Sequence, residues 1–178
     1  SPNDPELLFQ TYQSLDAAMQ PAGHLLEKLA EQTPEAMTPQ LWTRLGQVRQ
    51  AANLIQPALD AFLKGVDPNK AKPAPETAVA IGQLFVKVGN LPQAEYWLKM
   101  AADNDEPNAL TALFSLLEIN LRQEDWADAE ATITQLDTQF PGAVEASQWE
   151  QARQELTRWR KSQDEMKAKL AEAQADEK

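Results

Sequence analysis

Prolines recur along this 178-residue chain at intervals that limit it to short helices. One set follows apolar runs of helical period: Pro34, Pro68, Pro107 and Pro141. A second set falls midway between them: Pro21, Pro57 and Pro92. Because proline cannot continue a helix but fits its first turn, the first set predicts helix ends and the second predicts helix starts. The chain is therefore predicted to form a helix, a short turn and a second helix, four times over.

The predicted second helices also begin with an alanine at a nearly constant interval. These residues are Ala22, Ala58, Ala94 and Ala129, which are 36, 36 and 35 positions apart. Four positions after each comes a large apolar residue: Leu26, Phe62, Leu98 and Ile133. A small residue lets two helices cross closely, and the larger residues fill the space beside the crossing. One such hairpin cannot bury its apolar face alone, so the period predicts stacked hairpins.

Three segments resemble the tetratricopeptide repeat (TPR) family, whose pattern is Trp-x2-Leu-Gly-x2-Tyr, then a small Ala, an aromatic residue and a late Pro. Residues 39–68 carry Trp42, Leu45, Gly46, Ala58, Phe62 and Pro68. Residues 75–108 carry Ile81, Gly82, Phe85, Ala94, Leu98 and Pro107. Residues 110–143 carry Leu113, Leu116, Ala129, Ile133 and Pro141. In the last segment Leu117 stands where the other two have glycine, so we expect its helices to cross at a wider separation or to be shifted.

The resemblance implies an all-α, right-handed solenoid of about four helical hairpins with a C-terminal capping helix. The expected divisions are a degenerate N-terminal hairpin at 1–38, TPR-like repeats at 39–74, 75–108 and 109–143, and a capping helix with a polar tail at 144–178. A plain helical bundle built from similar hairpins is the alternative architecture.

The last segment has an apolar pattern of its own. Residues 143–175 contain neither proline nor glycine. Its pattern advances by three- and four-residue steps: Trp149, Ala152, Leu156, Trp159, Gln163, Met166, Leu170 and Ala173. This a/d spacing fits a helix that covers the open end of the last repeat. It also fits a coiled coil with a second copy or a partner, so both interpretations stay open.

The charge and composition exclude several classes of partner and chemistry. The net charge is −11, and the whole acidic excess lies in residues 1–149, which argues against nucleic-acid binding. The chain has no cysteine, which excludes disulfides and thiolate metal sites. The absence of cysteine is compatible with both the periplasm and the cytoplasm. We expect either location, with the periplasmic side of a bacterial membrane favoured slightly. No apolar run is long enough to predict membrane insertion. Because the chain begins at Ser1 without methionine, we expect it to be processed or part of a longer protein.

The sequence offers no pattern for catalysis, so we expect a non-enzyme without cofactor or metal. His24 is the single histidine, and no second ligand type accompanies it. The paired carboxylates Asp103 with Asp105 and Glu124 with Asp125 fall at predicted turns, where capping explains them. Glycine-rich phosphate loops are absent.

In the TPR family the first helix of each repeat lines a concave groove, so the resemblance implies which residues face a partner. They are Gln40, Thr43, Arg44, Gln47 and Gln50, then Glu76, Val79, Gln83, Val86 and Lys87, then Thr111, Phe114, Glu118, Leu121 and Arg122. Family members that grip a C-terminal carboxylate use a lysine–asparagine clamp, whereas this sequence has Thr43, Gln47, Ala80 and Ser115 there.

The resulting expectation is a protein-interaction scaffold or assembly factor that binds a partner peptide or helix in this amide-rich groove. The alternative is a structural oligomer subunit of a bacterial envelope or secretion complex, which would associate through the C-terminal helix.

Overall fold

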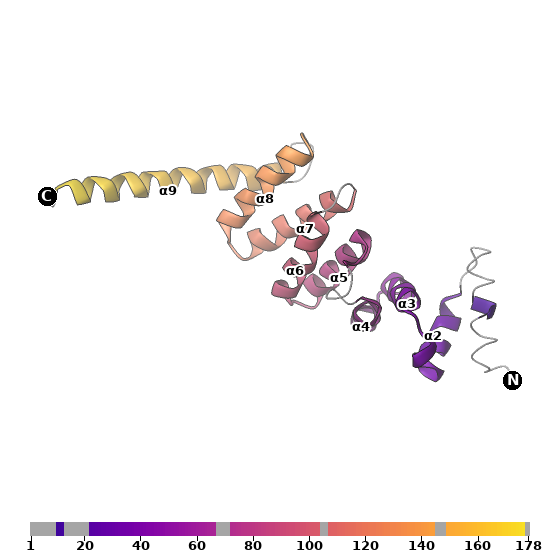
Figure 1. Ribbon diagram of the computed structural model, residues 1–178. Coiled ribbons are helices and arrows are strands. Elements are labelled where there is room, and N and C mark those ends of the chain that lie inside the picture. The colour runs from indigo at the N-terminus through magenta and orange to yellow at the C-terminus, as the bar shows by residue number, and fades with distance from the viewer. Residues whose placement is uncertain (1–9, 13–21, 67–71, 104–106, 145–148, 177–178) are drawn as a thin grey trace. The chain divides into compact units, whose positions relative to one another are not determined.

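The structure is a computed structural model that describes residues 10–12, 22–66, 72–103, 107–144 and 149–176, with side chains up to Leu170 in the last range (Figure 1). Every regular element in these ranges is helical, which confirms the all-α class. The elements are α2 (Gly23–Gln32), the 3₁₀ turn η1 (Pro34–Ala36), α3 (Pro39–Ala51), α4 (Ile55–Gly65), α5 (Pro75–Lys87), α6 (Leu91–Ala102), α7 (Asn108–Arg122), α8 (Trp126–Gln139) and α9 (Glu150–Asp176).

The prolines in the described ranges mark the helix boundaries as expected, while Pro21 and Pro68 lie outside the described residues. Pro34, Pro107 and Pro141 stand shortly after the ends of α2, α6 and α8, and Pro57 and Pro92 lie in the first turns of α4 and α6. Side-chain caps reinforce three starts. Thr38 Oγ1 accepts from the Leu41 amide at 3.3 Å, Asn90 Oδ1 from the Gln93 amide at 3.3 Å and Asp125 Oδ1 from the Asp128 amide at 3.2 Å. Each cap satisfies one of the amides that a helix start leaves unbonded. The predicted first helix of the N-terminal hairpin lies mostly outside the described residues.

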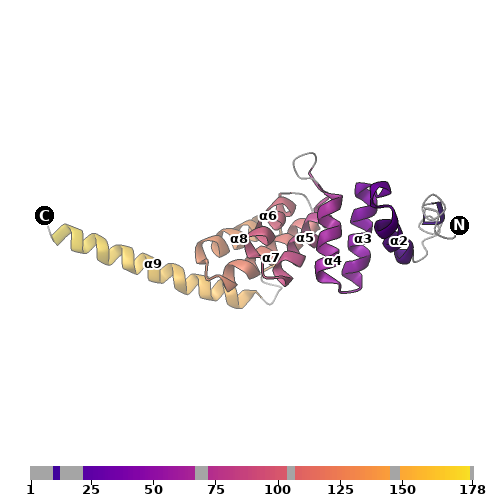
Figure 2. The same ribbon diagram turned by 90° about the horizontal axis from the view of Figure 1, so that it is seen from below.

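The chain forms two compact units, Ser1–Trp97 and Leu98–Lys178, and the division falls inside α6. In the first unit α3 packs along α4 as a hairpin, α2 packs against α3, and α4 contacts α5 (Figure 2). In the second unit α7 packs on α8, and α8 contacts α9. The repeat limits derived from the sequence stay a prediction.

The aligned alanines and apolar residues form the interior of the hairpins. Ala58, Ala94 and Ala129 are each 0% exposed. In the first unit the α3–α4 crossing is close: a Cβ added to Gly46 would lie 2.7 Å from the ring of Phe62, which is itself fully buried. In the second unit Leu117 is also fully buried, and α7 contacts α8 less extensively than α3 contacts α4. The glycine at position 46 is therefore explained by the aromatic ring that faces it.

The turns inside the three hairpins repeat one backbone arrangement. Asn53, Gly89 and Glu124 have φ values of 58°, 79° and 57°. In each turn the amide of the following residue donates a hydrogen bond to the carbonyl five residues before it, at 2.8 to 2.9 Å. The donors are the amides of Leu54, Asn90 and Asp125, and the acceptors are the carbonyls of Arg49, Phe85 and Asn120. This is the Schellman arrangement, in which a left-handed residue ends one helix and lets the chain reverse. The turns recur at the same interval as the alanines.

The residue type at the left-handed position should tune the stability of each turn. We expect Gly89→Ala to lower the free energy of unfolding by about 1 kcal/mol, because a Cβ disfavours positive φ. Nothing lies within 4 Å of the added atom, so the effect is conformational only. Conversely, Glu124→Gly should stabilise the chain by about 0.5 to 1 kcal/mol. Urea denaturation measures both. The control is Gln123→Ala, at φ −86°, and equal effects at 89 and 123 would contradict the explanation.

A half-buried ion pair joins α2 to α3. Arg49 donates from Nε to Glu27 Oε1 at 3.0 Å and from an Nη to Glu27 Oε2 at 2.6 Å. Its other Nη donates to the Pro57 carbonyl at 3.1 Å, next to the start of α4. The hydrogen bonds to Glu27 raise the pKa of Arg49 above its ordinary value. One side chain thus connects three helices of the first unit.

Removing the charge of Glu27 should weaken this connection. We expect Glu27→Gln to lower the free energy of unfolding by about 1 to 2 kcal/mol, because an amide cannot accept both guanidinium hydrogen bonds. Thermal melts followed by circular dichroism report the change. The matched control is Glu35→Gln, on an exposed residue of η1. A loss no larger than that of the control would show that the ion pair contributes nothing.

Candidate functional site

The predicted partner-facing residues of α3 are largely accessible. Gln40, Arg44 and Gln47 are exposed, while Thr43 and Gln50 are half-buried. Arg44 donates from an Nη to Gln47 Oε1 at 3.1 Å, so one helical turn of this face is bridged by side chains. The face therefore presents amides and a guanidinium group, which can bond to a peptide backbone.

The corresponding face of α5 is more mixed. Glu76 and Lys87 are exposed near opposite ends of the helix, and Gln83 and Val86 are half-buried. Val79 is only 7% exposed and packs as a core residue. Its buried side chain leaves little for a partner to contact, so the apolar part of this face comes from Val86.

The predicted residues of α7 lie in the second unit. Thr111 and Arg122 are exposed, and Phe114, Glu118 and Leu121 are half-buried. Glu118 and Arg122 form an i,i+4 ion pair at 2.5 Å. The Phe114 ring stacks on Trp149 just before α9, with centroids 6.2 Å apart and planes inclined by 17°. Sequence reasoning assigned Phe114 to the open face and Trp149 to the cap, and the structure brings the two together.

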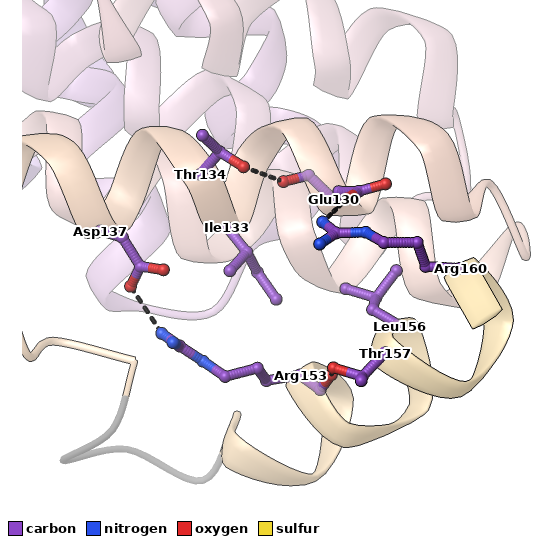
Figure 3. A pocket seen from close by; sticks show the side chains of 8 residues that line it. All are labelled: Glu130, Ile133, Thr134, Asp137, Arg153, Leu156, Thr157 and Arg160. Atoms are coloured by element: carbon purple, nitrogen blue, oxygen red, sulfur yellow. Dashed lines mark hydrogen bonds and ion pairs between the residues drawn. The ribbon is translucent and has the colours of Figure 1, made fainter. Parts of the chain in front are cut away.

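A cleft of about 240 Å³ lies between α8 and α9 (Figure 3). Ile133 of α8 and Leu156 of α9 line it and are 7% and 6% exposed. Arginines of α9 stand beside this apolar contact and reach to acids of α8. Arg153 donates to Asp137 Oδ1 at 2.5 Å, and Arg160 pairs with Glu130. An apolar seam bordered by ion pairs therefore holds α9 on the last hairpin.

Sequence reasoning missed these ion pairs, although α8 gave a signal. The helix Trp126–Gln139 contains Asp128, Glu130 and Asp137 and no lysine or arginine. The first half of α9, in contrast, carries Arg153, Arg158, Arg160 and Lys161. This imbalance between adjacent helices indicates an electrostatic contact, but the individual pairs depend on how the helices pack.

A second cavity, of about 250 Å³, lies where α6, α7 and α8 meet within the second unit. Asn120 is 4% exposed, and its amide donates to Thr132 Oγ1 at 3.2 Å. Thr132 in turn donates to the Asp128 carbonyl at 2.8 Å. These bonds fix the polar residues at the hairpin interface and give them a structural role.

The residues that the structure describes carry neither a metal-binding cluster nor a membrane-spanning helix. Among them no cluster of three or more His, Cys, Asp or Glu side chains has a geometry that suits a metal ion. No helix in the same ranges combines the length and the apolar character required to cross a bilayer.

The fold defined by these helices is that of a TPR-like helical repeat protein. It is similar to a solved structure from Pseudomonas aeruginosa, titled "Functional Characterization of Pseudomonas Aeruginosa pilF", which is of a TPR-containing protein. The TM-score is 0.55 and the sequence identity 19%, over 87% of this chain and 68% of that chain. No protein-family model matches the sequence. A comparison with curated proteins also gives no match. The likeness thus shows the fold.

Proposed function

We propose that this chain is a non-catalytic scaffold or assembly factor that binds a peptide or helix of another protein through the first helices of its repeats. The observation that carries the proposal is the two-sided character of α3, α5 and α7. Each buries one side in its hairpin and exposes amides or charges on another side, among them Gln47, Lys87 and Arg122. Side-chain amides can bond to a partner's backbone, and half-buried Val86 and Leu121 can accept its apolar groups.

A peptide array with follow-up titrations tests this proposal. Fifteen-residue peptides of varied sequence would be screened against the full chain, and those that bind would be titrated by fluorescence anisotropy. We expect Arg44→Glu in α3 and Phe114→Glu in α7 to weaken binding by about tenfold or more. The matched control is Lys28→Glu, which makes the same charge change on an exposed residue of α2.

Two outcomes would contradict the proposal: no peptide binds, or the α3 and α7 variants bind as the control does. Because Phe114 stacks on Trp149, a melting curve of Phe114→Glu must accompany its titration. The exposed Arg44 carries the test if that variant loses structure.

A further inference from the structure

The apolar stripe of α9 continues beyond the part that packs on the preceding hairpin. Ala152 and Leu156 are each 6% exposed, whereas Met166 and Leu170 are 62% and 60% exposed. The steps between these residues, through Trp159 and Gln163, keep one heptad phase, so the buried and the exposed parts lie on the same face of the helix. Figures 1 and 2 both show the second half of α9 extending past α8.

The covered half shows what kind of surface this face accepts. Its apolar contact is with Ile133 of α8, and Arg153 and Arg160 pair with Asp137 and Glu130. Since α8 carries acidic residues and no basic ones, the helix seated on the first half of the stripe is an acidic amphipathic helix. The ion pairs add charge complementarity to apolar burial.

The uncovered half repeats the same chemistry. Lys167 and Lys169 occupy the e and g positions on either side of Met166 and Leu170, while Asp164 and Glu165 point toward the opposite face by helical phase. Both lysines are exposed, and neither forms an ion pair within the described part of the chain. In these ranges no helix covers this segment, which we define as the distal strip, residues 163–170.

We propose that the distal strip binds an acidic amphipathic helix of another protein, which extends the seam that α8 begins. A second copy of this chain fits less well. In parallel pairing Lys167 would face Ser162 and Lys169 would face Gln174, so neither lysine would gain a carboxylate. Antiparallel pairing centred on the distal strip would bring Lys167 and Lys169 of one copy close to the same lysines of the other copy, so like charges would meet. Charges at e and g positions choose coiled-coil partners, so this pattern selects a partner with Glu or Asp there.

Two designed peptides test the proposal with the full chain. Both have about four heptads, which is enough for a stable helix on binding, and leucine at a and d. One carries glutamate at e and g, the other lysine. Fluorescence anisotropy should show the glutamate peptide binding about tenfold more tightly than the lysine peptide, and the difference should shrink between about 50 and 500 mM NaCl.

Variants show where the peptide binds and separate the contribution of charge from that of apolar contact. The double variant Lys167→Glu with Lys169→Glu should bind the lysine peptide more tightly than the glutamate peptide. The double variant Met166→Gln with Leu170→Gln should bind the glutamate peptide about tenfold or more weakly than the parent chain does. All four side chains are exposed, so these variants should keep their melting temperature. The control is Lys161→Glu, which lies opposite the stripe by helical phase and should bind as the parent does.

The proposal fails if neither peptide binds, if both bind equally, or if the lysine variants leave the preference unchanged. It also fails if sedimentation shows the chain alone to be a dimer that Met166→Gln with Leu170→Gln separates, because the strip would then serve a second copy. None of these outcomes tests α3, α5 and α7, so the proposed binding of a peptide by those helices is tested separately.

Discussion

Gly46→Leu should lower the free energy of unfolding of the first unit by about 3 kcal/mol or more, because it overpacks the α3–α4 crossing. The first atom of any side chain at this position would lie 2.7 Å from the Phe62 ring. The ring is fully buried and cannot move aside without displacing its neighbours. For a chain of this length such a loss corresponds to a fall in melting temperature of about 10 °C.

A double-mutant cycle makes this explanation specific. Phe62→Ala alone should cost about 3 to 5 kcal/mol through the cavity that it leaves. Combined with Gly46→Leu the cost should be well below the sum, because the leucine occupies part of that cavity. Gln47→Leu, on the next and exposed residue of α3, controls for adding a leucine to this helix. Additive costs would contradict the proposed contact.

Leu156→Ala should loosen α9 from α8. The side chain is 6% exposed in the seam beside Ile133, and its truncation should cost about 2 to 3 kcal/mol. The effect should appear as amide hydrogen exchange about 30- to 140-fold faster over residues 150–160, since each 1.4 kcal/mol is a factor of ten. The hairpin of α7 and α8 should keep its protection.

The same helix provides a control with identical chemistry. Leu170→Ala removes the same atoms from a side chain that is 60% exposed, so it should change stability by less than about 0.5 kcal/mol. Similar exchange rates in the two variants would mean that α9 is not held by the seam.

The interior of the hairpins could be predicted from the sequence because its period follows from steric rules. The positions chosen for Ala58 and Phe62 are buried, and the glycine of the Trp-x2-Leu-Gly pattern faces that phenylalanine. The left-handed turn residues were harder to find. Gly89 is a residue type typical of such a position, but Glu124 is not, and only the recurrence of the backbone bonds identifies it.

The candidate site was less predictable, because pairing across helices depends on packing that a linear pattern does not specify. The family resemblance implied an open face for Phe114, yet its ring meets Trp149 from beyond α8. Likewise nothing in the spacing of Asp137 and Arg153 shows that they meet at 2.5 Å. Whether the exposed residues of α3, α5 and α7 receive a partner stays a prediction.

The three hairpin turns show how little of the chain the architecture has to specify. Each reversal is made by main-chain bonds, and its left-handed position is filled by asparagine, glycine or glutamate. What each repeat must keep is a small residue at the crossing, a few apolar neighbours and one position able to turn. Most other side chains are free to change, so proteins with this fold can diverge until their sequences share little more than the spacing of a few residues.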